Sequence, residues 1–428
     1  MPVTASSGAG YYKNATSLIM KKMIFTVLLT FSMAYAFCQE IPEGFPKQAY
    51  KFSQQINREL TQEELRSARA SWHYSYIGKY QEAMDTYPDV DTRHGFDQLS
   101  KEDSLHFLTF EAADAFEYIL ERAKKEQIII INEAHHKPQH RVFTRRLLAG
   151  LYNEGFRYFG LECLTPNAMD TTAKELILDT VLQERGYPLH SYFTGTYTTE
   201  PQMANLVRDG IKTGFTIFAY ERFRKGDREQ KQAENINRIL EQDSTAKILI
   251  HCGWDHLLED TISTSGKQHW MAWHLKQMTG IAPFTINQDF LTEGKKGAEA
   301  KLFTIINETR TSVFVNKKGE TYNGPKGWNK FDVLVYHPRS KYQKNRPDWL
   351  TTLEGHKLYE LDKSRIEIDY PVLVKVYHPD ERPDATPWDI IELASEEDQT
   401  ALVLPGGNFV LKLNNPVGEE QEISILVK

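Results

Sequence analysis

The strongest constraint in this 428-residue chain is a run of four isoleucines at 128–131 that ends in a carboxylate and two imidazoles. Four consecutive large apolar side chains are typical of a short strand that is buried on both faces. Pro138 suits the first turn of a helix, and the apolar spacing that follows it predicts that helix. Glu133 and His135 are therefore expected at the C-terminal end of a buried strand. In open α/β sheets this edge is where ligands bind.

The alternation of strand and helix continues after this point. Further strands, separated by helical segments, are expected at 157–161, 215–220, 247–250, 281–286 and 331–336. This alternation predicts an α/β fold with a mostly parallel sheet flanked by helices. The end of the chain instead carries short apolar runs between Pro, Gly, Asp and Asn turns, which predict a small C-terminal antiparallel β domain.

The N-terminus has the features of a signal peptide. Lys21-Lys22 forms a positive region, residues 23–33 form an apolar region, and small residues near 34–36 offer a cleavage site. Met20 is then the expected true start. The apolar region is too short for a membrane span, so we expect an exported protein, periplasmic or secreted, with no integral membrane segment after signal removal. A lipoprotein anchored at Cys38 is the less favoured alternative.

We divide the chain into four parts on these grounds. They are a signal peptide at 1–38, a helical region at 39–104, an α/β catalytic domain at 105–345 and a β domain at 355–428. A net charge of −7 and the lack of a Lys/Arg block argue against nucleic acid as the main partner. Cys163 and Cys252 are the cysteines beyond the signal region, and either a disulfide or two buried thiols is compatible with their positions.

Acidic and imidazole side chains stand at the ends of four expected strands. They are Glu133 and His135 after the first strand, Glu162 after the second, Glu221 after the third, and His251 with His256 after the fourth. Strand ends usually favour Gly, Asn, Asp and Ser, so this set indicates a site at one sheet edge. Such a cluster can bind a divalent metal such as Zn, Mn or Co. It can also perform general acid/base catalysis, with a carboxylate fixing the tautomer of a histidine. The expected metal ligands are Glu133, His135, Glu162 and His256.

Structural alternatives exist for several of these residues. Glu162 and Glu221 could cap the next helix or pair with an arginine. In the adjacent pair His135 and His136, one ring is expected to point away from the site. Arg145 could bind a substrate anion or offset the nearby carboxylates.

An aromatic stretch at 186–199 is the candidate for substrate recognition. It contains Tyr192 and Tyr197, and loops near such an edge commonly determine specificity. The alternative is that these rings belong to the buried core. No position in the stretch selects a particular substrate.

The segment 132–140 resembles a known family motif. Its sequence Asn-Glu-Ala-His-His-Lys-Pro-Gln-His is similar to the Gly-Glu-x-His-x-x-Pro-x-His opening of the ChaN-like proteins. These belong to the superfamily that also holds the erythromycin esterases and the TraB/TIKI proteins. Glu162 matches the second acidic position of the superfamily, and 251–256 resembles its later His/Gly-x-x-His motif. The resemblance covers about residues 105–340 and leaves out the C-terminal β domain. Asn132 departs from it, because the family has Gly there.

The resemblance implies different activities in different branches. Erythromycin esterases open a lactone with a histidine-activated water, TIKI-type members are metal-dependent proteases, and ChaN binds haem. In the esterase pattern Glu-x-x-His, His136 replaces His135 as the base and Arg145 falls near the arginine of that family.

The favoured hypothesis is an exported hydrolase of ester, lactone or peptide bonds, with or without a divalent metal, acting on a small-molecule or peptide substrate. In it Glu133 with His135 or His136 activates water, and Glu162, His251 and His256 complete the cluster. Arg145, Glu221, Tyr192 and Tyr197 are expected to bind substrate. The alternative is a haem- or iron-ligand-binding protein in which the histidines are axial ligands. A third hypothesis is an inactive α/β domain whose β tail is an interaction module. The oligomeric state stays open.

Overall fold

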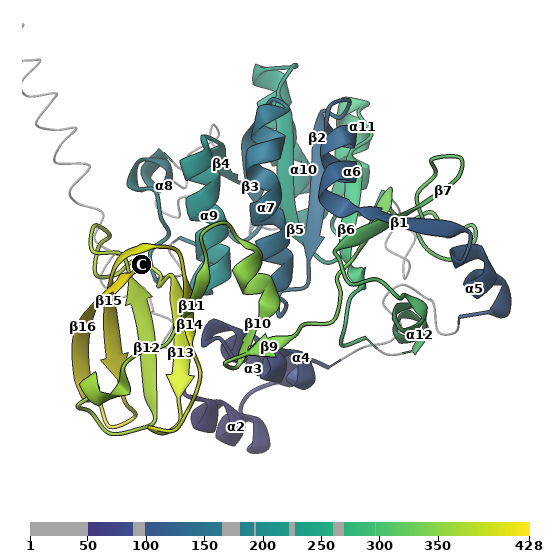
Figure 1. Ribbon diagram of the computed structural model, residues 1–428. Coiled ribbons are helices and arrows are strands. Elements are labelled where there is room, and N and C mark those ends of the chain that lie inside the picture. Colours follow the sequence, from purple (N-terminus) through teal and green to yellow (C-terminus); the bar gives the residue numbers. More distant parts are fainter. Residues whose placement is uncertain are drawn as a thin grey trace, which may run out of the picture. The chain divides into compact units, whose positions relative to one another are not determined.

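The computed structural model describes residues 50–88, 99–164, 180–191, 194–221, 227–259, 269–295 and 297–428 (Figure 1). The predicted signal peptide at 1–38 lies outside these ranges. Residues Pro46–Lys428 form one compact unit. In the described ranges, no helix has both the length and the apolar character that a membrane crossing needs.

Eight strands among the described residues form the central sheet. In spatial order they are β1 (Phe110–Asp114), β7 (Ser312–Asn316), β8 (Val333–Tyr336), β6 (Phe284–Leu291), β2 (Ile128–Glu133), β5 (Lys247–Gly253), β3 (Phe156–Leu161) and β4 (Thr216–Ala219). From β8 to β4 all neighbours pair in parallel, and only the pairs of β7 with β1 and β8 are antiparallel. The predicted mostly parallel α/β sheet is confirmed.

Helices cover both faces of this sheet (Figure 1). One face is covered by α6 (Ala115–Ala123), α7 (Gln139–Asn153) and α9 (Pro201–Thr213), and the other by α10 (Arg228–Gln242), α11 (Met271–Thr279) and α12 (Gly297–Ile305). Ile129 and Ile131 pack into the first layer, whereas Ile128 and Ile130 pack into the second. All four are fully buried, because successive side chains of a strand point to opposite faces and both faces here are covered.

The N-terminal part of the described chain is helical, as predicted. It contains α2 (Ser53–Thr61), α3 (Ser67–Tyr76), α4 (Tyr80–Thr86) and α5 (Lys101–Phe107), and a further helix, α8 (Thr180–Arg185), lies later in the chain. The segment at 110–116, which has helix-forming composition, begins instead as strand β1. Pairing with β7 overrides the local preference. Asp114 then caps α6 by accepting hydrogen bonds from the backbone N–H groups of Phe116 and Glu117.

The C-terminal part consists of small antiparallel sheets, as predicted. One sheet has the order β13 (Asp389–Leu393), β12 (Val372–Tyr377), β15 (Gly407–Asn414) and β16 (Glu420–Val427), and a second pairs β11 (Lys357–Tyr359) with β14 (Leu402–Leu404). Short elements precede or join them: β9 (Tyr342–Gln343), β10 (Arg346–Pro347), η1 (Asp348–Thr352) and η2 (Lys363–Arg365). Apolar side chains from both sheets form one core.

The register of the central strands places their carboxyl ends side by side. Ile131 of β2 and Leu161 of β3 both lie opposite His251 of β5, and Glu133 lies opposite Gly253. The residues that follow these strands therefore meet at one edge of the sheet.

Candidate functional site

Glu133 is the centre of the site and is completely buried. Its Oε1 accepts hydrogen bonds from His135 Nδ1 at 2.7 Å and Arg141 Nη2 at 2.9 Å. Its Oε2 accepts from Arg141 Nε at 2.6 Å and His251 Nε2 at 3.1 Å. Burial alone would raise the pKa of Glu133, but the Arg141 charge and these hydrogen bonds hold it well below its ordinary value. Glu133 is thus a fixed carboxylate that orients its neighbours.

His135 has one nitrogen bound and one open. Its Nδ1 donates to Glu133, whereas Nε2 has no hydrogen-bond partner in the part of the chain that the structure describes. The ring lies among the aromatic rings of Trp72, Tyr197 and Trp254, at centroid distances of 5.5, 4.6 and 5.7 Å. Its side chain keeps 10% exposure next to the fully buried Glu133. This arrangement presents a single imidazole nitrogen toward a partly aromatic surface.

Gly253 allows this ring to approach the end of β5. A Cβ atom at this position would lie 2.4 Å from His135 Cε1, 2.7 Å from His135 Nε2 and 2.9 Å from Glu162 Oε2. A side chain would therefore collide with both groups, so only glycine fits between them. The distances also show that His135 Nε2 and Glu162 flank the same point of the backbone.

Glu162 is the second carboxylate of the site. It accepts hydrogen bonds from Arg228 Nη2 at 2.6 Å and from the backbone N–H of Gly253, and Tyr197 Oη lies 3.5 Å from its Oε2. Burial would raise the pKa of Glu162, but His256, His135 and Arg228 hold it well below its ordinary value. Glu162 is therefore an ionised acceptor rather than a proton donor.

His256 lies between two carboxylates. Its Nδ1 donates to Glu229 Oε2 at 2.6 Å and its Nε2 lies 3.3 Å from Glu162 Oε1. Burial would lower the pKa of His256, but the two carboxylates raise it to about 10. Arg228 Nη1 also lies 3.0 Å from Nε2, a contact that would need a neutral ring as acceptor. We assign the protonated form, because the two carboxylates outweigh this one contact, so that His256 and Arg228 both face Glu162 Oε1.

His251 and Glu221 each support another member of the cluster. His251 holds Glu133 through Nε2, and its Nδ1 lies 3.3 Å from the hydroxyl of Thr144. Glu221 accepts hydrogen bonds from Arg228 and, at 2.9 Å, from Gln232 Nε2. The sheet edge thus brings together Glu133, His135, Glu162, Glu221, His251 and His256 as the sequence predicts, with Tyr197 over them. The predicted residue Tyr192 lies outside the described residues.

His136 points away from this group. It stacks on Tyr87 with ring centroids 3.8 Å apart and an interplanar angle of 1°. Burial and the neighbouring Lys137 hold the pKa of His136 well below its ordinary value. The His136 ring is therefore neutral and packs against Tyr87, away from the carboxylates that His135 contacts.

On helix α7 the arginine that contacts Glu133 is Arg141 and not the predicted Arg145. Arg145 donates to Asp209 at 2.8 Å and to Gln202 at 2.9 Å, so it binds helix α9. Arg141 lies one turn earlier on the same face of α7, and that turn is the one next to the strand end. It is fully buried and joins Glu133 to Glu200, whose Oε2 lies 2.7 Å from its Nη1.

Several other residues of the site were not predicted from the sequence. They are Trp72, Arg141, Glu200, Arg228 and Glu229. Arg228 and Glu229 open α10, the helix that follows Glu221 in the chain, and this position could have signalled them. Trp72 lies on α3, in a region where the sequence predicted no functional residues. No local sequence pattern marks it as part of a site. Its Nε1 is buried without a hydrogen-bond partner among the described residues.

The arrangement of the donors does not fit the predicted metal set. Both oxygens of Glu133 and both of Glu162 already accept hydrogen bonds, and both nitrogens of His256 face carboxylates. Of the four predicted ligands, only His135 offers a free atom. Among the described residues, no group of three His, Cys, Asp or Glu side chains is placed to hold a metal ion.

Cys163 and Cys252, the cysteines among the described residues, are free and buried. Cys163 packs in the layer of α6, α7 and α9, and Cys252 packs in the layer on the opposite face of the sheet. Burial raises the pKa of both thiols well above their ordinary value. They are small apolar core residues in this fold.

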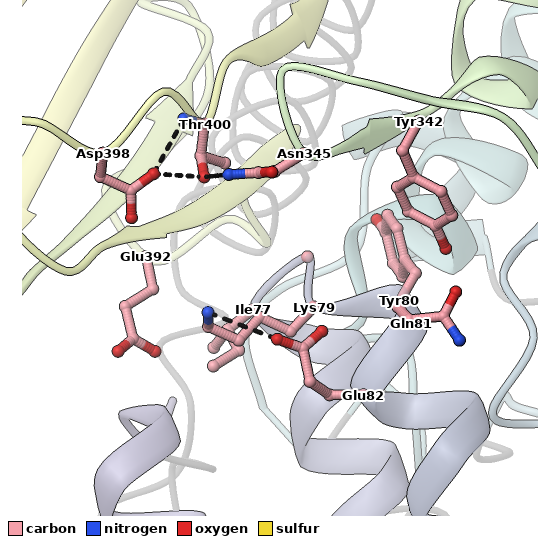
Figure 2. A pocket seen from close by; sticks show the side chains of 11 residues that line it. Ile77, Lys79, Tyr80, Gln81, Glu82, Tyr342, Asn345, Glu392, Asp398 and Thr400 are labelled. Carbon is pink, nitrogen blue, oxygen red and sulfur yellow. Dashed lines mark hydrogen bonds and ion pairs between the residues drawn. The ribbon is translucent and has the colours of Figure 1, made fainter.

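A cavity of about 530 Å³ lies away from the cluster, and Figure 2 shows the side chains that line it. Its acidic groups include Glu82, Glu392 and Asp398, with Tyr342 at one side. Glu392 accepts hydrogen bonds from the backbone N–H and the hydroxyl of Ser53, at 2.8 and 2.7 Å, and thereby fastens α2. None of the predicted site residues lines this cavity.

The sequence matches no protein-family model, and no curated protein is significantly similar to it. Among solved structures, the type III effector HopBA1 is similar at a TM-score of 0.31 and 9% identity, covering 56% of this chain and 99% of HopBA1. RRSP, a MARTX toxin effector domain from Vibrio vulnificus CMCP6, is similar at a TM-score of 0.28 and 14% identity, covering 65% of this chain and 48% of RRSP. At these TM-scores neither likeness defines a family for this chain.

Proposed function

We propose that this chain is an exported hydrolase of ester, lactone or peptide bonds in which His135 activates water. The observation that carries the proposal is the Glu133–His135 pair. Glu133 accepts a hydrogen bond from Nδ1–H of His135 at 2.7 Å, and Nε2 has no hydrogen-bond partner among the described residues. A carboxylate that fixes the imidazole tautomer in this way leaves the other nitrogen available as a general base.

The reaction follows from these roles. Nε2 of His135 removes a proton from water while the water oxygen attacks the substrate carbonyl, and the imidazolium returns that proton to the leaving group. Glu133 stabilises the imidazolium, and Arg141 with His251 holds Glu133 in place.

Positive charge stands beside the proposed reaction point. Arg228, whose side chain is 43% exposed, and the protonated His256 both lie against Glu162. Cations fixed in a partly buried site stabilise the oxyanion that forms on the carbonyl. The hydroxyl of Tyr197 is a further donor near the same carboxylate.

Two features of the sequence support the biological setting. The positive and apolar regions within residues 21–36 have the pattern of a signal peptide. The segment 132–140 resembles the ChaN-like opening, whose superfamily includes hydrolases that use a histidine-activated water. Export and superfamily membership are part of the proposal.

Hydrolysis of a panel of p-nitrophenyl esters, lactones and an unstructured peptide tests the activity. His135→Gln is expected to lower kcat by about 10²–10⁴-fold on any substrate that the wild type turns over. His136→Gln is the matched control, because it alters the adjacent identical side chain that stacks on Tyr87. Equal activity in His135→Gln and wild type, or loss confined to His136→Gln, would overturn the assignment.

Elemental analysis and an absorption spectrum of the same sample address the metal and haem alternatives. The proposal expects turnover that persists after chelation, since the carboxylates of the cluster are already bound by protein donors. A stoichiometric metal whose removal abolishes turnover would contradict the metal-free reaction. A haem spectrum lost in His135→Gln would replace the hydrolase with a binding protein.

A further inference from the structure

The segment that carries Tyr197 lies against the C-terminal β sheet. We call the described residues 186–191 and 194–199 the Tyr197 loop, and residues 378–388, which join β12 to β13, the β12–β13 connection. The two segments are almost 200 positions apart in the sequence. Their contact is the place where the β sheets reach the candidate site.

The first half of the Tyr197 loop pairs with the connection through backbone groups. Leu189 and Ala385 form an antiparallel bridge. The N–H of His190 donates to the carbonyl of Asp384 at 2.8 Å, and the N–H of Thr386 donates to the carbonyl of Pro188 at 3.0 Å. The loop is therefore held to the connection by an isolated antiparallel bridge and two flanking backbone hydrogen bonds.

The second half of the loop is held by side chains. Thr386 Oγ1 donates to the carbonyl of Thr198 at 3.1 Å, and Tyr50 Oη donates to the carbonyl of Thr199 at 2.8 Å. Both threonines of the first contact are fully buried. A buried carbonyl that lost this donor would be left unsatisfied, which is costly.

The connection is itself fastened to helix α9. Arg208 makes a bidentate ion pair with Glu381, at 2.8 and 2.6 Å, and also donates to the carbonyl of Thr386. Asn205 donates to the carbonyl of Trp388 at 2.8 Å. The Arg208 and Glu381 side chains keep only 5% and 10% exposure. Such a buried two-point pair fixes geometry as well as distance.

The other side of the Tyr197 loop reaches the catalytic groups. Thr196 N–H donates to the carbonyl of Cys163 at 2.9 Å, next to Glu162. Gly195 lies so close that a Cβ there would be 2.1 Å from that carbonyl. The Tyr197 ring then stands 4.6 Å from the His135 ring, between centroids.

We propose that the β12–β13 connection is a positioning element of the site, with Thr386 as its key residue. It holds the Tyr197 loop so that the Tyr197 ring covers His135 and its hydroxyl faces Glu162. The C-terminal sheets thus contribute to the site indirectly, because the β12–β13 connection holds the Tyr197 loop. The effect of this positioning on turnover rests on the proposed hydrolase function. The positioning itself can be measured without a substrate.

Hydrogen exchange in the full mature chain measures the positioning directly. Thr386→Val keeps the shape of the side chain and removes the donor to Thr198. Exchange in the peptide that covers 194–200 is expected to become about fivefold faster, while the central strands keep their protection. Thr321→Val is the control, because it also removes one threonine hydroxyl hydrogen bond to a backbone carbonyl, that of Asp332, outside the Tyr197 loop. Unchanged exchange at 194–200 would overturn the proposal.

A second variant keeps the test decisive if Thr386→Val does not fold. Glu381→Gln weakens the pair with Arg208 and leaves Thr386 intact, and it is expected to raise exchange in the same peptide. Faster exchange throughout the chain in both variants, with no excess at 194–200, would show general destabilisation and contradict the positioning role.

Kinetics test whether the positioning acts through Tyr197. Thr386→Val is expected to lower kcat/KM about tenfold in the wild type and to have little further effect in a Tyr197→Leu background. Additive losses would contradict a route through Tyr197, since independent sites add and coupled sites do not. If no substrate is ever hydrolysed, the proposed function fails while the exchange result still decides the positioning role.

Discussion

At the residue scale, the site contains two ionised carboxylates, Glu133 and Glu162, and each is held by its own set of partners. Glu133 is fixed by Arg141, His135 and His251, whereas Glu162 is fixed by Arg228, His256 and the Gly253 backbone. Among the described residues, His135 contacts the first carboxylate and also borders the second. This division leaves His135, among the described members of the cluster, with one ring nitrogen bound to Glu133 and the other without a hydrogen-bond partner.

The protonated state of His256 predicts a specific dependence of stability on pH. Its pKa is raised from 6.5 to about 10 in the folded protein, so the folded state binds more protons than the unfolded state between these values. Its contribution is fully present below pH 6.5 and is lost as pH rises toward 10. The free energy of unfolding should fall by up to about 1.4 kcal/mol per pH unit in this window. Urea unfolding at a series of pH values measures this slope.

His256→Gln should remove that slope and lower the free energy of unfolding at pH 6. His378→Gln, which alters a partly exposed ring in the β sheets, should keep the slope. An alkaline slope that is the same in wild type and His256→Gln would show that His256 is not held protonated by Glu162 and Glu229.

The end of strand β5 determines the geometry of the site at the element scale. Directly after Gly253, Trp254 adopts a positive φ of 49°, in the left-handed region that side chains rarely adopt. Asn132 stabilises this turn, since its Nδ2 donates to the Trp254 carbonyl at 2.7 Å and its Oδ1 accepts from the N–H of Gln288. Asn132 therefore ties the end of β2 to β5 and β6.

Gly253→Ala tests the close approach at this turn. The new Cβ would displace the His135 ring and the Glu162 carboxylate, so kcat/KM is expected to fall at least about 100-fold. Gly406→Ala is the control, because the nearest atom to a Cβ there is the Val427 carbonyl oxygen at 3.6 Å. Equal kcat/KM in Gly253→Ala and Gly406→Ala would mean that the ring need not occupy this position.

Residues from Pro46 to Lys428 behave as one compact unit at the scale of the whole molecule. Buried ion pairs cross between the α/β part and the C-terminal sheets. Besides Arg208 with Glu381, the fully buried Arg346 donates to Asp389 at 2.6 Å and to the carbonyl of Gly78 at 3.2 Å. Removing one partner of such a pair leaves a buried charge uncompensated.

Truncation after residue 354 should therefore destabilise the α/β part. A chain of residues 39–354 is expected to lose the cooperative thermal transition of the 39–428 chain, because Arg208 and Arg346 lose their carboxylate partners. Circular dichroism during heating measures the transition. A truncated chain with an unchanged transition would show that the sheets are an independent appendage.

The predictable parts of the molecule were those with a local signal. The isoleucines of β2 revealed a doubly covered strand, and the residues after β2, β3 and β5 meet because parallel strands share an edge. Arg141 escaped prediction, since a fully buried arginine is rare and its partner Glu200 is 59 positions away. Trp72 and β7 were not predicted either. Each is placed by a contact with a segment that is distant in the sequence, and local periodicity carries no information about such contacts. Positions that depend on pairing between distant segments are the ones that local patterns do not determine.

The tautomer of His135 tests the central claim most directly. Long-range ¹H–¹⁵N spectra of the full mature chain, labelled at histidine, report which nitrogen carries the proton when the ring is neutral, and His135→Gln assigns the signals. We predict a proton on Nδ1 and an unprotonated, uncoordinated Nε2, as the 2.7 Å contact with Glu133 requires. A neutral ring protonated on Nε2, or an Nε2 shifted by metal coordination, would contradict the water-activating role of His135.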